Sequence, residues 1–313
     1  MDPITLNYDN TLSEFAAGYS VGKYIADLVC PIVLVDDKAG TYKKRSLTEM
    51  ISSHVDDLIA SGGEANEVSY DATDATYVCI DRALKELVPR HLLDRNPLTS
   101  REKVTRFVMN KLLHLREIRV ADLLLTAANY ATSNTANASD WTDESSGTPL
   151  SDIDTGIAAV SNGMEGDTKL VAATSLEMWQ ALRKHPDLRG GGAEGRVLTT
   201  EQVASLIGVD EIHVSDTQKN TADPEAAVTK ARIWGTDKFA IVRVPVGDPD
   251  DEQGLFAATF RHRPISDGGG VMVRRWDEPG KGAEGSEAVQ CSFSDAEQVV
   301  QNDAGYLLTG LTA

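Results

Sequence analysis

The sequence predicts an α+β protein in which a domain-length helix is followed by a block of short alternating elements and then by strands. Three observations predict this class. Residues 98–131 carry an apolar stripe at helical spacing, residues 151–265 alternate short helix and strand patterns, and residues 266–313 return to strand patterns. The chain has 313 residues, 41% of them hydrophobic, which suits one large domain or two to three subdomains.

The N-terminal segment predicts a helix that is followed by a strand. Residues 11–28 place Leu12, Phe15, Tyr19 and Leu28 on one side of a helix, and Asn10 offers its N-cap. Pro31 ends this helix, and the apolar run over residues 32–35 is typical of a short strand.

A long polar excursion follows. Residues 36–67 are weakly periodic, and the next strand pattern comes at residues 76–80. Strands this far apart cannot form a tight hairpin, and an isolated two-stranded ribbon is marginal in water. We therefore expect an extended loop with little core of its own, supported by a neighbouring subunit.

The strongest local pattern is the helix over residues 98–131. Asn96-Pro97 and a capping box from Thr99 to Glu102 mark its start. About 33 residues would span roughly 50 Å, the width of a domain. Its apolar stripe consists of Val104, Val108, Leu112, Leu115, Ile118, Ala121 and Leu125. A basic helix face could meet nucleic acid, but we expect its cations to be solvated or paired with acidic neighbours: Arg101, Lys103, Arg106, Lys111, Arg116 and Arg119.

The rest of the chain has shorter elements. Residues 132–150 are predicted to be a loop that contains Trp141, and residues 190–195 a glycine-rich loop. Helices are predicted near 152–161, 175–184 and 200–207. Strands are predicted at 169–173, 211–214, 231–234, 239–244, 271–276, 288–293 and 306–308.

The composition argues against nucleic-acid or membrane binding. Thirty Lys and Arg against 48 Asp and Glu give a net charge of −18, whereas phosphate binding relies on basic patches. Such acidity usually reflects a solvated surface, and it also suits a wall that confines DNA without adhering to it. No run of about 20 apolar residues and no signal peptide is visible, so we expect a soluble protein that stays inside the cell that makes it.

No motif for catalysis, cofactor binding or metal ligation is present, and we predict no catalytic, cofactor-binding or metal residue. Cys30, Cys79 and Cys291 lie far apart and are expected to be buried structural thiols. The histidines lack metal-ligand spacing, and the glycine runs match no phosphate-binding loop. The adjacent carboxylates at 36–37, 56–57 and 250–251 are expected to be solvated loop residues. We predict a protein that is not an enzyme.

Four segments in order carry a family resemblance. They are residues 24–35, residues 77–89, the end of the long helix at 115–124, and residues 178–188 with the helix and strand that follow at 200–216. Together they resemble the major capsid proteins of tailed bacterial and archaeal viruses, which share the Hong Kong 97-type fold. The match spans nearly the whole chain, and its specificity lies in the order of the segments.

The resemblance implies a Hong Kong 97-type capsid fold with five parts. They would be an N-terminal arm (1–32), an extended loop (33–89), a peripheral domain with a spine helix (90–150), an α/β axial domain (151–265) and C-terminal strands of the peripheral domain (266–313). It implies self-assembly into hexamers and pentamers that form an icosahedral head around double-stranded DNA, made in the host cytoplasm and found in the virion. Scaffolding protein, portal and decoration protein are the implied partners, and no cofactor is implied.

Two departures from the family pattern stand out. The chain starts almost directly at the arm, so a scaffolding extension would be a separate protein or already removed. Lys38, Lys43 and Lys44 lie where some relatives form isopeptide crosslinks, but no acceptor asparagine matches, so we expect no crosslink.

The sequence is compatible with two alternatives. An encapsulin-type compartment shell would share the fold and enclose an enzyme cargo. A soluble α/β hydrolase or transferase would instead need a pocket of convergent polar groups, for which the sequence offers no residues.

Overall fold

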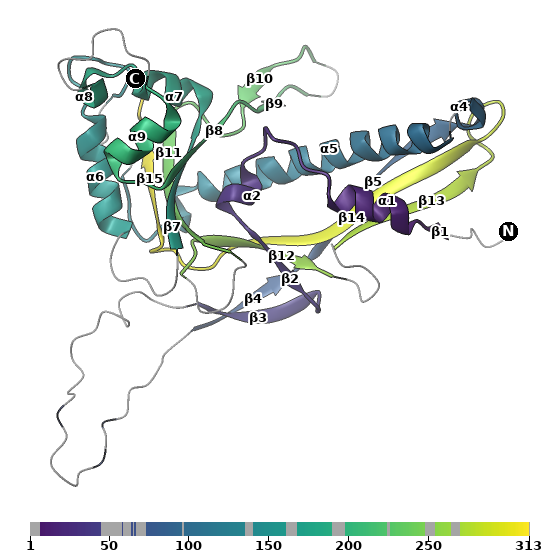
Figure 1. The fold of residues 1–313 in the computed structure, drawn as a ribbon, viewed down its shortest axis with the longest axis horizontal. Coiled ribbons are helices and arrows are strands. Elements are labelled where there is room, and N and C mark those ends of the chain that lie inside the picture. Colours follow the sequence, from purple (N-terminus) through teal and green to yellow (C-terminus); the bar gives the residue numbers. More distant parts are fainter. Residues whose placement is uncertain are drawn as a thin grey trace.

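The computed structural model describes residues 7–44, 58, 64, 66, 73–95, 97–134, 140–160, 168–189, 198–223, 226–247, 254–263 and 270–312. They form an elongated sheet beside a long helix and a compact α/β unit at one end of that helix (Figure 1). The predicted α+β class is confirmed. The predicted loop at 190–195 and the carboxylates at 56–57 and 250–251 lie outside the described residues.

The elongated sheet is centred on the strand β14. Its order is β1-β13-β14-β12-β2, and β5 also pairs with β14. β13 and β5 both pair with residues 286–293 of β14, so they lie on its opposite edges. All pairs are antiparallel except β12 with β2. The strands are β1 (Asn7–Tyr8), β2 (Ile32–Val35), β5 (Ile80–Pro89), β12 (Ala257–His262), β13 (Val271–Glu278) and β14 (Ser286–Val299).

Helix α5 (Pro97–Leu124) runs along this sheet (Figure 1). Its 28 residues correspond to about 42 Å. The helix begins at Pro97, one residue before the predicted start, and the missing N–H of a proline costs nothing at this position. It ends at Leu124, seven residues before the predicted end, and the 3₁₀ turn η1 (Ala127–Asn129) follows.

Side chains just beyond α5 explain why it stops. Tyr130 Oη donates to the carbonyl of Leu124 at 2.6 Å, and Asn129 Nδ2 donates to that of Leu123 at 2.7 Å. These bonds satisfy two of the carbonyl groups that a helix end leaves without a partner.

The α/β unit contains a five-stranded sheet with the order β6-β15-β11-β7-β8. Its strands are β6 (Ser133–Asn134), β7 (Thr168–Ser175), β8 (Glu211–Ser215), β11 (Lys238–Pro245) and β15 (Gly305–Thr309). The helices of this unit are α6 (Pro149–Val160), α7 (Leu176–Leu182), α8 (Pro186–Arg189) and α9 (Thr200–Ile207). A small hairpin of β9 (Gln218–Asn220) and β10 (Lys230–Arg232) projects from it (Figure 1).

Both faces of the five-stranded sheet are buried. Ile241 and Leu308 pack with residues of α6, α7 and α9, whereas Ala240 and Leu307 pack with the end of α5. This explains the nearly continuous apolar runs of β7 and β11, because a strand that is buried on both sides shows no alternation. The C-terminal end of α5, which is the predicted spine helix, therefore belongs to the core of the α/β unit.

The predicted helix over residues 11–28 is wrong in its length. The structure has two helices, α1 (Asn10–Ala17) and α2 (Ala26–Val29), and Gly18 ends the first. Asp9, in place of Asn10, is the N-cap: its side chain accepts from the N–H of Leu12 at 3.0 Å. Glycines at 18 and 22 weaken helix propensity in the interval, and Leu28 is largely exposed.

The excursion after β2 begins and ends in a two-stranded ribbon of β3 (Ala39–Lys44) and β4 (Thr73–Val78). Tyr42 and Tyr77 lie on Phe260 of β12, with ring centroids 5.1 and 4.7 Å apart. The expectation of a support from a neighbouring subunit is therefore wrong for this base, which packs on its own subunit. The rest of the excursion, apart from isolated residues, lies outside the described residues.

Strand pairing differs from the predicted boundaries at three places. β12, which we grouped with the block at 151–265, pairs with β14 in the elongated sheet. β15, which we grouped with the strands at 266–313, pairs with β11 in the α/β unit. The predicted return strand at 76–80 is two strands, β4 and the ten-residue β5, and β5 belongs to the elongated sheet. Helix α4 (Arg90–Arg95) then leads to α5.

Candidate assembly surfaces and the joint that positions them

The described residues contain no group of three His, Cys, Asp or Glu side chains that could hold a metal ion. The three cysteines are free and buried, as predicted. Burial raises the pKa of Cys30 to about 11 and that of Cys291 to about 12, so both thiols are protonated at neutral pH. None of the described helices is long and apolar enough to span a membrane.

A hollow of about 360 Å³ lies beside the junction of β5, β12 and β13, and its lining includes Lys38, Asp81, His262 and Ser294. These residue types could suggest acid–base chemistry. However, Lys38 Nζ donates to both oxygens of Asp81, at 2.7 and 2.8 Å, and Ser294 also donates to Asp81. The Asp81 carboxylate is thus bound by Lys38, at the base of the ribbon, and by Ser294. These contacts do not include one between the imidazole of His262 and the hydroxyl of Ser294.

Glu117 of α5 joins three parts of the molecule. It is fully buried, at 0% exposure, and its carboxylate accepts from the N–H groups of Ile25 and Ala26 at 3.2 and 2.9 Å. It also accepts from the indole N–H of Trp234 at 2.6 Å. Ile25 is the N-cap of α2 and offers no side-chain bond of its own, so Glu117 supplies that cap from another helix.

The environment of Glu117 is costly for a charge. Burial raises the pKa of Glu117 above its ordinary value, against the hydrogen bonds it accepts. A buried carboxylate is tolerated only where hydrogen-bond donors compensate for its lost hydration. We therefore interpret Glu117 as the joint between the spine helix, the N-terminal segment and the turn that carries Trp234 in the α/β unit.

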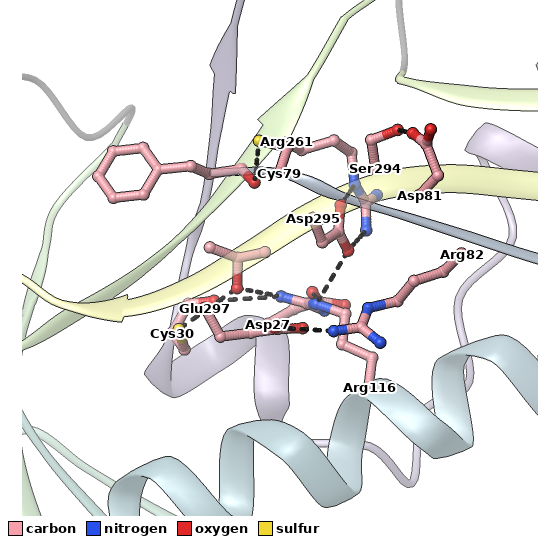
Figure 2. A network of polar contacts seen from close by, with 12 residues as sticks. Asp27, Cys30, Cys79, Asp81, Arg82, Arg116, Arg261, Ser294, Asp295 and Glu297 are labelled. Atoms are coloured by element: carbon pink, nitrogen blue, oxygen red, sulfur yellow. Dashed lines mark hydrogen bonds and ion pairs between the residues drawn. The ribbon is translucent and has the colours of Figure 1, made fainter. Parts of the chain in front are cut away.

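Arg116, the residue before Glu117, also contacts this N-terminal segment (Figure 2). Its side chain is 2% exposed and forms an ion pair with Asp27. It also donates to the carbonyl of Cys30 at 3.3 Å and to the hydroxyl of Thr259 at 3.1 Å. Asp295 of β14 lies 4.0 Å away, so Arg116 links α2, β12 and β14 to the spine.

Three further ion pairs, buried or half-buried, lie within the elongated sheet or join α5 to it. Arg261 and Asp295, both buried, form a bidentate pair at 2.7 and 2.8 Å (Figure 2). On α5, Arg101 pairs with Glu287 at 2.7 Å and Arg119 with Glu297 at 2.8 Å. The prediction that cations of the spine helix are paired with acidic neighbours is confirmed for Arg101, Arg116 and Arg119.

The solvent face of α5 differs. Lys103, Arg106 and Lys111 are exposed, and none of them has an ion pair among the described residues. Arg106 lies 5.1 Å over the ring of Phe15, and Lys111 lies 6.0 Å from the ring of Phe107. This cationic strip stands out on a chain with a net charge of −18 and is a candidate contact surface.

The three lysines considered for crosslinking sit on or beside the ribbon. Lys38 is paired with Asp81, and Lys43 pairs with Asp74 on the opposite strand at 2.6 Å. Lys44 is exposed. Two of the three therefore have an intramolecular carboxylate partner, and the absence of a crosslink stays a prediction.

Sequence reasoning missed the joint. The predicted apolar stripe of α5 includes Leu115, which is 46% exposed, whereas the neighbouring Arg116 and Glu117 are buried in its place. A signal was available, because these two charges lie beside apolar residues at 118, 120, 121 and 124. Their partners in α2, β12 and the turn at Trp234 could not be found from local pattern.

Comparison with known proteins shows the fold. No protein-family model matches the chain, and no curated protein matches it. Among solved structures, a phage-related protein from Bordetella bronchiseptica RB50 is 20% identical, covers 97% of both chains and has a TM-score of 0.74. The capsid of cyanophage P-SCSP1u is 14% identical over 94% of this chain and 91% of that one, with a TM-score of 0.57.

A virus-like particle from Pyrococcus furiosus is similar over 95% of this chain and 96% of that one, at 10% identity and a TM-score of 0.52. The chain therefore has the Hong Kong 97-type fold that the sequence resemblance implied, over nearly its full length.

Proposed function

We propose that this chain is the major capsid protein of a tailed virus. The observation that carries the proposal is the likeness to the cyanophage capsid subunit over almost the full length of both chains. An elongated subunit with an extended ribbon offers a large surface to its neighbours. Its function is to contact further copies, and the contacts close through rotational symmetry.

The finer assignments follow from the same proposal. The subunits would form hexamers and pentamers of an icosahedral head, assembled in the host cytoplasm and retained in the virion. The segment before β2 would act as the arm, the ribbon and the residues beyond it as the extended loop, α5 with the elongated sheet as the peripheral domain, and the α/β unit as the axial domain. A scaffolding protein, a portal and a decoration protein are the proposed further partners.

The charge supports enclosure of DNA without specific binding. A net charge of −18 makes the average surface repel phosphate. The cationic strip on α5 has three exposed cations, fewer than the about 6–10 phosphate contacts of a protein that binds nucleic acid tightly.

Electron microscopy of the purified full-length protein tests the proposal. We expect closed shells or flat hexameric capsomers. A stable monomer that turns over a substrate would overturn it, and would restore the hydrolase or transferase alternative.

A deletion tests the part given to the extended loop. Replacing residues 46–71 by a short glycine linker spares Tyr42, Tyr77 and the paired residues of β3 and β4. We expect a folded subunit, with unchanged circular dichroism, that no longer assembles. If the shortened subunit assembles as well as the parent, those residues are not an assembly element.

A compartment shell is the second candidate, and the likeness to the Pyrococcus furiosus particle favours keeping it. Shells purified from expressing cells and treated with nuclease would separate the two. Protected double-stranded DNA supports the virus head, whereas a stoichiometric protein cargo supports the compartment.

A further inference from the structure

Strand β5 leaves one long edge of the elongated sheet open. All ten of its residues pair with β14, and none of the described strands pairs with its other edge. Ile80 is 56% exposed and Leu84 is 36% exposed on this strand. A strand edge with free N–H and C=O groups is a template for pairing with another chain, and natural proteins seldom leave such an edge long.

Two charges on this strand lack good partners within the subunit. Glu86 is exposed and has no ion-pair partner among the described residues. Arg82 is 3.9 Å from its carboxylate, Glu297, and its buried Nε has no hydrogen-bond acceptor. The two residues are four apart, so they lie on the same face of the strand, the face to which Leu84 also belongs.

We propose that β5 pairs with β5 of a second copy about a two-fold axis that passes through Leu84, perpendicular to the sheet. The pairing is antiparallel and joins the two elongated sheets into one. Leu84 then faces Leu84 of the second copy, and Arg82 faces Glu86 of the second copy twice, once on each side of the axis. Cross-strand neighbours of opposite charge stabilise such a pair.

Among the axes at residues 82–85, the charge pattern favours the one at Leu84. An axis at Arg82 or at Lys85 would place like charges opposite each other. An axis at Ala83 would oppose Asp81 and Lys85, but these are already held by Lys38 at 2.7 Å and by Glu278 at 2.6 Å. The axis at Leu84 is the register that uses the two charges left without good partners.

The helices permit this approach. A two-fold axis perpendicular to the sheet keeps both spine helices on the same face, and α5 packs against both β14 and β5. If α5 lies midway between these strands, the two helices are separated by roughly 10 Å, from a strand spacing of about 4.8 Å. This is the ordinary distance between packed helices.

This inference rests on the proposed function in one respect, since a shell supplies two-fold contacts between its subunits. The contact itself can be tested without a closed shell. Disulfide trapping is suited to it, because a residue on the axis meets itself.

The main variant is Leu84→Cys with Cys291→Ala, because Cys291 lies directly opposite Leu84 on β14 and could trap the new thiol inside the subunit. We expect a covalent dimer after mild oxidation, linked through position 84 in both chains, as shown by peptide mass mapping. Ala83→Cys with Cys291→Ala is the matched control, since the two Cα atoms of position 83 would lie about 8 Å apart across the axis, too far for a disulfide. Cys291→Ala alone should stay monomeric on a denaturing gel.

Charge reversal gives a second readout that does not depend on thiols. Glu86→Arg should raise the subunit concentration needed for the contact by about tenfold or more, because it places two like-charged pairs across the axis. Glu284→Arg, a reversal at an exposed turn of the same sheet, should leave it unchanged.

The outcomes separate the two proposals. Dimers linked through position 84 in assembled shells support both, and shells without them, or with position 84 linked to another segment, overturn the edge pairing alone. Dimers without shells or capsomers support the pairing and count against the capsid assignment. If neither forms, or if Glu86→Arg has no effect on the contact, the pairing is wrong.

Discussion

Replacing Glu117 by alanine should release the N-terminal segment from the spine helix. The change removes an acceptor that three donors share: the N–H groups of Ile25 and Ala26 and the indole of Trp234. Each donor is buried, and a buried donor without a partner costs about 1–3 kcal/mol. Relief from burying a carboxylate offsets part of that sum, and we expect a net loss of about 3 kcal/mol in the free energy of unfolding.

Two measurements on unassembled subunits check this. Urea unfolding gives the global loss, and hydrogen exchange gives the local one, which should concentrate in residues 24–30 and around Trp234. Glu102→Ala, on the same helix but half-buried and without an ion pair among the described residues, is the control and should change stability by less than about 0.5 kcal/mol. A loss below about 1 kcal/mol for Glu117→Ala, with unchanged exchange in the segment, would refute its role as a joint.

Substitutions at the ribbon, at the Arg261–Asp295 pair and at Glu117 itself should have three further effects. Tyr77→Ala should cost about 3 kcal/mol through lost packing on Phe260, and limited proteolysis should then cut the ribbon while the rest of the subunit stays intact. Asp295→Ala should cost about 3–5 kcal/mol in urea unfolding because it strands the buried Arg261, whereas a double change of Arg261→Met with Asp295→Leu should cost less than the single one. Burial raises the pKa of Glu117 above 4.5, so between 4.5 and the raised value the folded subunit binds more protons than the unfolded chain and its stability falls as pH rises. Glu117→Gln should remove that fall from the pH profile of the urea midpoint, and an unchanged profile would mean that another group titrates there.

The helices and strands that are defined by local signals could be predicted from the sequence. Helix α9 lies at Thr200–Ile207 as predicted, because its capping box of Thr199 and Gln202 and its apolar spacing are contained within a short stretch of chain. The strands β7, β8 and β11 were found for the same reason. The long helix was found as well, since its stripe repeats over many turns, but its ends were misplaced because Asn129 and Tyr130 set one of them from outside the helix.

The candidate surfaces were predicted less well. The sequence indicated an excursion without a core, but the stacking of Tyr42 and Tyr77 on Phe260 depends on residues that lie far apart in the chain. The open edge of β5 was not predicted either. Which edge of a strand remains free depends on the order of the whole sheet, and local alternation carries no information about that order.

The sequence by itself determined the fold class, the order of elements and the acidic surface, because propensity, periodicity and charge act within a few residues. Only the tertiary structure decided that β12 and β15 exchange sheets relative to the predicted boundaries, and that Arg116 and Glu117 lie buried as the joint. Such choices depend on long-range partners: a charge can be buried on a helix only where the remaining chain brings it donors or an opposite charge. In this protein those partners come from α2, β12, β14 and the turn at Trp234.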